Sequence, residues 1–324
     1  MSAKRKADES RAGVDLSNLD QPLFDGADAT KRDLVDYLDA VHERMLPGLQ
    51  DRPLSVIRVR PGAEPFMQKN LPSSAPEWVR TVTMWAESSK RDVSYAVCDD
   101  RRTLLWFANQ RAVEYHPALV AAGAVGPSHL VLDLDPPAGG PFADVVRAAR
   151  LVQQALTDVG LAGAPKTSGS KGLHVYVPLT DGTTVEDAAA ATRAVAARAE
   201  RIGPDVGTTA FVIADREGKV FLDATRAGGA TVVAPYSPRI RPGATVSFPL
   251  TWDDLDDVVP RDLTIRTAVD VLGDGDPWRE HMPAPQPLPA DLVEEGHGIP
   301  LARVQAMHEG KRRARGRSEG GPGR

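Results

Sequence analysis

Two stretches of the sequence decide the fold, SHLVLDLD (128–135) and KTSGSKGLHVYVPL (166–179). Each contains a short run of mainly apolar residues, which is typical of a buried β-strand. The first run ends in acidic residues followed by two prolines, and the second follows a loop of small polar residues. Between them, apolar residues recur at helical spacing in PFADVVRAARLVQQALTDVG (141–160). The pattern therefore predicts a strand, a helix and a second strand.

The residues around this unit predict further elements. Pro141 suits the start of a helix and Gly160 its end. Thr183 and Glu186 have the spacing of a capping box, before an alanine-rich helix that we expect to end near Gly203. Three more stretches predict strands: GKVFLDA (218–224), TVVAPYS (231–237) and ATVSFPL (244–250). Because strands and helices do not alternate regularly, we expect an α+β fold with mixed β-sheets flanked by helices.

Composition places the chain among soluble globular proteins. Its 324 residues, 42% of them hydrophobic, suffice for one large domain or two tightly joined lobes. No apolar run approaches the roughly 18 residues of a membrane span, and the charged N-terminus has no apolar stretch behind it. Cys98 is the single cysteine, which excludes an intramolecular disulfide and a cysteine-based zinc cluster. We expect a cytoplasmic, nucleoid-associated protein without membrane contact.

Charge is distributed unevenly along the chain. The formal net charge is −5, yet residues 1–13 carry four cationic and two acidic side chains. Residues 310–324 carry six cationic side chains and one glutamate, so the body between is strongly acidic. We expect residues 1–13 and the basic tail of a C-terminal segment, 296–324, to be disordered, with a catalytic domain over 14–295. Any nucleic-acid site must then be a local groove, or rely on the tails or on bound cations.

Asp133 and Asp135 end the first predicted strand. Side chains two apart in a strand point to the same face, so both carboxylates can reach one pocket. Such a pair suits magnesium or manganese, and two ions about 4 Å apart need bridging carboxylates of this kind. Aspartates at strand ends are also common turn residues. Aspartyl-phosphate phosphatases and nucleotide-sugar transferases share the Asp-x-Asp pattern, although the two prolines here argue against the phosphatases.

The loop before the second strand has the composition of an anion-binding loop. Ser168, Lys171 and the loop glycines Gly169 and Gly172 offer a hydroxyl, a cation and free backbone N–H groups. The loop lacks the spacing of an NTPase P-loop. His174 alternates with apolar neighbours in the strand that follows, so we expect it to contact a ligand, with a triphosphate as the favoured one.

Three segments together resemble the catalytic motifs of one family, in the same order and spacing. They are LVLDLDPP (130–137), KTSGSKGLHVYVPL and VFLDATRAGGATVVAPYSPRIRPG (220–243). They are similar to the polymerase domain of bacterial DNA ligase D, a member of the archaeo-eukaryotic primase superfamily. The resemblance covers roughly residues 17–255. It implies the primase-polymerase fold, with a catalytic cleft between mixed sheets.

The resemblance also implies roles for individual residues. Asp133, Asp135 and Asp223 would hold two divalent ions, Mn²⁺ or Mg²⁺. Ser168, Lys171 and His174 would clamp the triphosphate of an NTP or dNTP. Further nucleotide contacts would come from four residues: His116, Arg226, Arg239 and Arg241.

Contacts with DNA are implied at Phe66 and Lys69, which match positions that touch template and substrate. Lys31 matches a basic residue that helps to recognise a 5′-phosphate across a gap. Two positions depart from the family pattern, because Gln21 replaces a basic residue and Met67 replaces a common second aromatic. These departures concern recognition of DNA ends and leave the expected metal and triphosphate sites intact.

The expected function is template-directed addition of nucleotides, with a preference for ribonucleotides, to primer ends at short gaps or breaks in DNA repair. A de novo primase and a non-catalytic adaptor that binds DNA ends are the alternatives. The three acids argue against the adaptor, which has no use for converging carboxylates. No ligase lysine motif of the KxDG type is present, so we expect sealing to need a separate ligase, with Ku as a further compatible partner.

Overall fold

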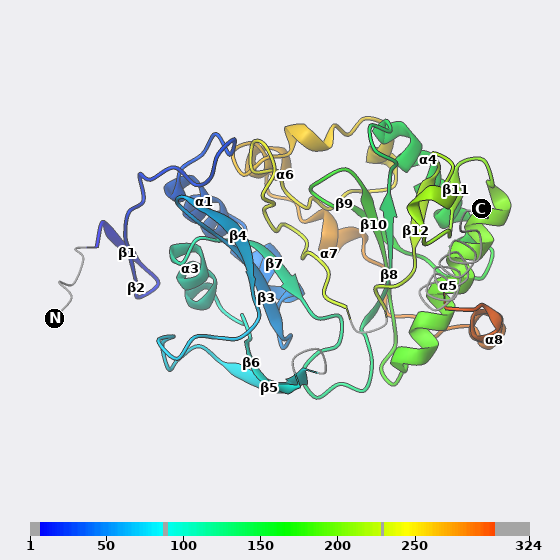
Figure 1. The fold of residues 1–324 in the computed structure, drawn as a ribbon, viewed down its shortest axis with the longest axis horizontal. Helices are drawn as coiled ribbons and strands as arrows, with labels where there is room; N and C mark the ends of the chain where they lie inside the picture. The colour runs from blue at the N-terminus through cyan, green and yellow to red at the C-terminus, as the bar shows by residue number, and fades with distance from the viewer. Residues whose placement is uncertain (1–6, 87–89, 228–229, 302–324) are drawn as a thin grey trace, which may run out of the picture.

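A computed structural model describes residues 7–86, 90–227 and 230–301. In these residues the chain forms two five-stranded sheets and a short N-terminal hairpin, with helices packed around the sheets (Figure 1). The first sheet lies in the N-terminal half of the sequence and the second in the middle third. This arrangement confirms the expected α+β class with mixed sheets and flanking helices.

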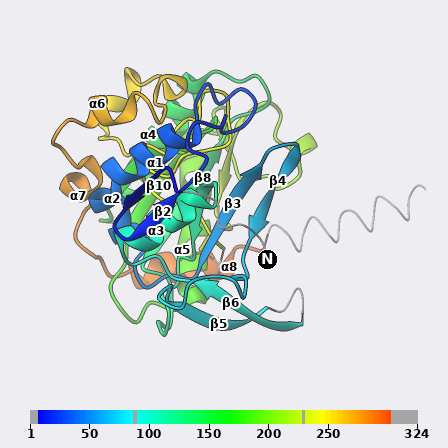
Figure 2. The same cartoon turned by 90° about the vertical axis from the view of Figure 1, so that its left-hand side faces the viewer.

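The first sheet has the order β4-β3-β6-β5, and β7 also pairs with β3. Its strands are β3 Leu54–Arg60, β4 Ala63–Gln68, β5 Thr81–Ala86, β6 Arg91–Ala96 and β7 Ala112–Pro117. The helices of this half are α1 Lys31–Ala40, α2 His42–Met45, η1 Leu46–Gly48 and α3 Arg101–Asn109. Thr30 and Asp33 form a capping box at the start of α1. Figure 2 shows α1, α2 and α3 grouped on one side of the β3–β4 hairpin.

The second sheet has the order β11-β12-β8-β10-β9, and only the β11–β12 pair is parallel. Its strands are β8 His129–Asp135, β9 Ala164–Thr167, β10 Leu173–Pro178, β11 Gly207–Thr208 and β12 Val220–Asp223. One face is apolar, with Leu132, Leu134 and Val175 fully buried, and α4 Phe142–Thr157 and α5 Val185–Ile202 cover it. The opposite face is therefore left for polar residues.

The remaining elements follow β12, apart from one turn just before it. They are η2 Ile213–Asp215, η3 Asp253–Asp256, η4 Pro260–Asp262, α6 Ala268–Leu272, α7 Pro277–His281 and α8 Ala290–Gly298. Helix α8 packs so closely on α5 that a Cβ on Gly296 would lie 1.9 Å from the carbonyl oxygen of Ala190. Glu295 also pairs with Arg198 and Arg201 of α5, at 2.6 and 2.7 Å. Helix α8 thus crosses the domain boundary expected at residue 295.

Two predictions about local structure are corrected here. The helix α5 is capped by Thr184, whose hydroxyl accepts from the backbone N–H of Asp187 at 3.0 Å, one residue after the expected Thr183–Glu186 pair. The stretches 231–237 and 244–250 form single bridges and not strands. Each contains or adjoins prolines, which have no N–H group to donate to a ladder.

The expected disorder of residues 1–13 is wrong for part of this segment. Strand β1 Glu9–Arg11 pairs antiparallel with β2 Val14–Leu16. The guanidinium of Arg11 lies 2.7 Å from Asp36 and 3.3 Å from Asp39, so ion pairs tie the hairpin to α1. Residues 1–6 and the basic tail at 310–324 lie outside the described residues.

Candidate active site

The predicted acidic residues meet on the polar face of the second sheet. Asp133 on β8 lies directly opposite Asp223 on β12 and opposite His174 on β10. His174 in turn lies opposite Lys166 on β9. Residues directly opposite in an antiparallel ladder point to the same face, so these four form one line across four strands. We call Lys166, His174, Asp133 and Asp223 the cross-strand row.

Asp135 lies two residues after Asp133 and therefore on the same face. The structure thus brings together the three carboxylates that the sequence singled out. Arg226, just after β12, lies between two of them, because its guanidinium donates to Asp133 Oδ2 at 2.9 Å and lies 3.3 Å from Asp223 Oδ2. Arg226 thus pairs directly with two of the three acids, while Arg216 and Lys166 also act on the group through their charge.

The carboxylates differ in their electrostatics. Burial and the neighbouring charge of Asp133 raise the pKa of Asp135 to about 6. Burial also acts to raise the pKa of Asp133, but the contact with His174 and the charge of Arg226 outweigh it and hold that pKa well below its usual range. Asp133 is therefore ionised, while Asp135 keeps its proton more readily.

His174 is buried, with only 4% of its surface exposed to solvent. Its Nε2 is 3.2 Å from Asp133 Oδ1, and its Nδ1 is 3.0 Å from the ammonium nitrogen of Lys166. Burial and the nearby Lys166 lower the pKa of His174 to about 4, so the ring is neutral at pH 7. Both ring nitrogens contact protein groups in this structure, and the expected triphosphate contact stays a prediction. His174 supports Asp133.

The loop Ser168–Gly172 joins β9 to β10 and presses against neighbouring chain segments. Gly169 has φ +66°, and a Cβ there would lie 2.6 Å from the Arg239 side chain. A Cβ on Gly172 would lie 2.2 Å from the carbonyl oxygen of Leu134, between the two aspartates of β8. The loop therefore sits beside the carboxylates, and glycine is required for this close approach.

Polar groups of this loop divide into inward and outward sets. The Ser168 hydroxyl accepts from the backbone N–H groups of Ser170 and Gly172, at 3.2 and 3.1 Å, so it stabilises the loop itself. Lys171 extends into solvent. Arg241, also exposed, donates from Nε to the Ser170 hydroxyl at 2.9 Å. We call Lys171 and Arg241 the cationic rim.

Glu114 on β7 links the first sheet to this site, and the sequence analysis missed it. Its carboxylate accepts from His116 Nε2 and from the backbone N–H of Ile240, both at 2.9 Å, and lies 3.1 Å from Arg239 Nε. Arg239 also donates to the carbonyl oxygen of Ser168. Burial acts to raise the pKa of Glu114, but the contacts with His116 and Arg239 lower it to about 2. The two-residue spacing of Glu114 and His116 on a strand could have indicated this pair.

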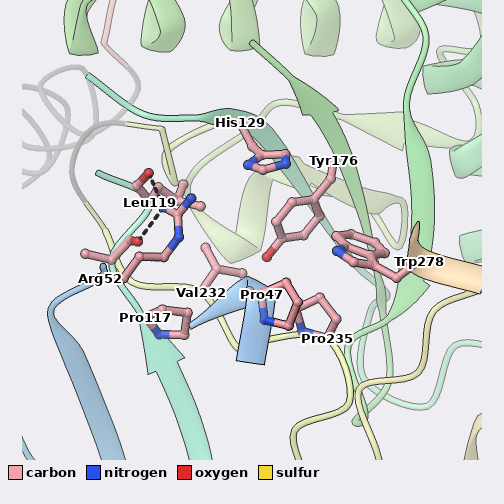
Figure 3. Close-up of a pocket in the computed structure, with 11 residues that line it drawn as sticks. Pro47, Arg52, Pro117, Leu119, His129, Tyr176, Val232, Pro235 and Trp278 are labelled. Atoms are coloured by element: carbon pink, nitrogen blue, oxygen red, sulfur yellow. Dashed lines mark hydrogen bonds between the residues drawn. The ribbon is translucent and has the colours of Figure 1, made fainter. Parts of the chain in front are cut away.

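The far end of the same face is apolar. Tyr176, two residues beyond His174, lines a cavity of about 120 Å³ together with His129, Trp278 and several prolines (Figure 3). Arg52 closes one side of this cavity by donating to the carbonyl oxygens of Ala118 and Leu119, at 3.1 and 2.7 Å. The acidic side chains are thus confined to the other end of β8, where the strand ends in Asp133 and Asp135.

Comparison with known proteins assigns this arrangement to a family. The family described as "LigD, primase-polymerase domain" matches residues 30–278, which is more than half of the chain. The chain belongs to the LigD primase-polymerase family. No helix of the described residues is long and apolar enough to cross a membrane.

Several relatives and one solved structure agree with this membership. The bifunctional non-homologous end joining protein LigD of Bacillus subtilis is 33% identical over 286 residues, covering 86% of this chain and 46% of that protein. The multifunctional non-homologous end joining DNA repair protein LigD of Mycobacterium tuberculosis is 37% identical over 267 residues, covering 79% and 35%. The chain therefore spans less than half the length of these relatives.

The solved structure is the polymerase domain from Mycobacterium tuberculosis ligase D in complex with DNA. It matches with a TM-score of 0.76 and 34% sequence identity, over 83% of this chain and 97% of that one. The match confirms the expected primase-polymerase fold.

The residues expected to contact DNA fall into two groups in this LigD-type fold. Phe66 on β4 is partly exposed and lies under two guanidinium groups, 4.4 Å from Arg60 and 5.6 Å from Arg58. Lys69 follows β4 and is exposed. Lys31 is only 3% exposed, and its ammonium donates to the Ser17 carbonyl at 2.5 Å and to Asn109 at 2.6 Å. A phosphate contact at Lys31 does not fit this geometry, because its donors are turned inward.

Proposed function

We propose that this chain is a template-directed nucleotidyltransferase that adds nucleotides to the 3′ end of a primer at short gaps or breaks in DNA. One observation carries the proposal. Asp133, Asp135 and Asp223 share one face of a sheet, and the Ser168–Gly172 loop, with its flanking arginines, lies against the same strand end. Nucleotidyl transfer needs this combination, because a polyphosphate brings negative charge to a site that must also hold cations.

Divalent ions fit the residues that are present. Burial and the charges of Asp133 and Asp223 raise the pKa of Asp135 despite the nearby arginines, so added positive charge would relieve the repulsion among the three carboxylates. Oxygen ligands of this kind suit Mg²⁺ or Mn²⁺. In the described ranges no three acidic or histidine side chains surround a common metal position, and Arg226 bridges two of the acids. We propose that Asp133, Asp135 and Asp223 hold the two ions, which when bound would activate the primer hydroxyl and stabilise charge on the phosphates.

The protein side chains have separable tasks in this proposal. Lys171, Arg241 and Arg239 neutralise and orient the triphosphate of the incoming nucleotide from the loop side. Arg226 pairs with Asp133 and Asp223 here, and would be available to contact a phosphate oxygen if divalent ions neutralised those carboxylates. His116 holds the nucleotide from the first sheet, with its ring oriented by Glu114. Ser168 keeps the loop in shape through its two backbone contacts.

Template and primer contact the first sheet in this proposal. Phe66 offers an aromatic face for a base, and Lys69 offers a cation for the backbone. The related polymerase domain solved in complex with DNA and the end-joining relatives support DNA as the substrate and break repair as the setting. We further propose a preference for ribonucleotides, stimulation by manganese, and cooperation with Ku and a ligase.

Primer extension on a gapped duplex tests the proposal. The purified chain is given a 5′-phosphorylated gap, Mn²⁺ or Mg²⁺, and each rNTP or dNTP separately against each of the four template bases. We expect addition of the complementary nucleotide, more efficiently with rNTPs, and no addition by an Asp133→Ala/Asp135→Ala double variant. If the wild type binds DNA but adds no nucleotide with either metal, the remaining interpretation is a non-catalytic adaptor that binds DNA ends. Synthesis on a template without a primer would instead identify a primase.

A further inference from the structure

Lys166 is a buried amine with an unusual set of partners. It lies at the end of the cross-strand row and is 0% exposed. Its ammonium nitrogen contacts the Ser247 hydroxyl, the Thr167 carbonyl at 3.4 Å and His174 Nδ1 at 3.0 Å, and it lies 5.7 Å from the Tyr176 ring centre. All of these partners are neutral. Burying an amine among neutral groups costs stability, so its presence calls for another reason.

The hydrogen-bond directions along the row are fixed by chemistry. The Lys166 amine lies 3.0 Å from His174 Nδ1 and donates to it, so Nδ1 accepts and carries no hydrogen. The ring hydrogen is then on Nε2, which lies 3.2 Å from Asp133 Oδ1, and the carboxylate oxygen accepts it. The row is thus a directed chain, in which Lys166 donates to His174 and His174 donates to Asp133.

These hydrogen bonds determine how the Asp133 carboxylate is held. His174 fixes Oδ1 at 3.2 Å, while Arg226 donates to Oδ2 at 2.9 Å. Two contacts hold the ring hydrogen on Nε2: the Asp133 carboxylate that accepts it and the Lys166 donor at Nδ1. Without the donor, the other tautomer becomes accessible and leaves Nε2 as an acceptor facing the carboxylate. Two acceptors in contact repel each other, so Asp133 would lose its fixed orientation.

We propose that Lys166 is a positioning residue that keeps His174 in its Nε2–H tautomer and thereby orients the Asp133 carboxylate for nucleotidyl transfer. Lys166 touches neither the substrate nor the reacting atoms, and it acts through His174 alone. The effect on nucleotidyl transfer rests on the proposed function, whereas the tautomer of His174 does not. Hydrogen-bond partners of metal-binding side chains act in the same way, and mutation of such a partner typically lowers activity about 10- to 100-fold.

The test compares two neutral substitutions of similar size. Lys166→Met removes every donor, and Lys166→Gln keeps an amide donor, so charge is lost in both and only the donor differs. Lys219→Met, a partly exposed lysine paired with Glu217, serves as a surface control. Ring ¹⁵N spectra of the whole protein at pH 7.5 report the tautomer, with His174→Asn used to assign the signals. Thermal melting checks that each variant is folded.

We expect the wild type and Lys166→Gln to show His174 with its hydrogen on Nε2, and Lys166→Met to show a mixture of tautomers. For primer extension we expect Lys166→Met to lower kcat about 10- to 100-fold with little change in KM for the nucleotide. Lys166→Gln should keep most of the wild-type kcat. A wild-type ring protonated on Nδ1, or an unchanged tautomer in folded Lys166→Met, would overturn the proposal. So would a changed tautomer with unchanged kcat. If the wild type adds no nucleotide, the proposed function fails, and the spectra still decide the hydrogen-bond chain.

Discussion

The two sides of the candidate site are built differently. The cross-strand row is buried, and its two carboxylates have protein partners: His174 and Arg226 at Asp133, and Arg226 at Asp223. The cationic rim of Lys171 and Arg241 is exposed, and the Arg241 side chain contacts two neutral oxygens, those of Ser170 and Ile240. A buried, paired group keeps one geometry, whereas an exposed cation is free to follow a ligand. We infer that the row sets the chemistry and the rim captures the polyphosphate.

Removing a carboxylate of the row should have the largest effect. Asp223→Asn keeps the size of the side chain and removes its charge. We expect templated addition to fall about 1000-fold, which corresponds to about 4 kcal/mol of transition-state stabilisation. Single-turnover extension on the gapped duplex measures the rate, and fluorescence anisotropy confirms that DNA still binds. A rate within tenfold of the wild type would show that templated addition does not require the Asp223 carboxylate.

Breaking the link between the two sheets should have an intermediate effect. In Glu114→Gln, the amide cannot accept from His116 and neutralise Arg239 together, so both nucleotide contacts lose their orientation. We expect kcat/KM for the nucleotide to fall about 10- to 100-fold, and the free energy of unfolding by urea to fall by about 1–3 kcal/mol. Glu64→Gln, an exposed glutamate on β4, is the matched control and should change neither quantity. Equal behaviour of the two variants would remove Glu114 from the site.

Changes in the cationic rim should be smaller and confined to binding. Lys171→Ala removes an exposed cation, so we expect KM for the nucleotide to rise about tenfold, the loss of one charge-assisted contact of about 1.4 kcal/mol. The melting temperature should stay within about 1 °C, since exposed charges contribute little to stability. Steady-state kinetics and a melting curve check both. An unchanged KM would show that the rim does not capture the nucleotide.

The repulsion within the acid group should appear as a small, pH-dependent change in stability without metal. The folded-state pKa of Asp135, about 6, lies above the ordinary value of about 3.9. Its protonation therefore stabilises the fold fully below that ordinary value, and the contribution is lost as pH rises through 6. Asp135→Asn mimics the protonated form, so we expect its melting temperature to exceed that of the wild type by roughly 2–4 °C at pH 7.5. The difference should shrink at pH 5, and Asp181→Asn, an exposed control, should show none.

The sequence predicted the buried side of the site better than its internal connections. The strand ending in Asp133 and Asp135, the helix after Pro141 and the strand ending in Asp223 were all found, because apolar periodicity and prolines are local features. The contacts of Lys166 and Glu114 depend on the register between strands far apart in the chain, which a local pattern does not encode. The sequence also did not reveal the burial of His174 and Lys31, because that burial depends on neighbouring elements.

Alternation of apolar residues was misleading in one region. The stretches 231–237 and 244–250 have the composition of strands, but prolines at 235, 238 and 249 interrupt the ladders. The residues still lie buried beside the loop, where Ser247 contacts Lys166 and Thr245 donates to the Gly169 carbonyl at 2.6 Å. Tertiary packing therefore decided the role of this region.

The most direct measurement is the single-turnover rate of templated addition at saturating nucleotide, for Asp133→Asn and Lys171→Ala side by side on one gapped duplex. Saturation removes differences in capture and leaves the chemical step. We predict that Asp133→Asn loses the rate about 1000-fold, whereas Lys171→Ala keeps the wild-type rate within about twofold because its loss acts on binding. A preserved rate in Asp133→Asn, or a comparable loss in Lys171→Ala, would contradict the division of the site into a catalytic row and a capturing rim.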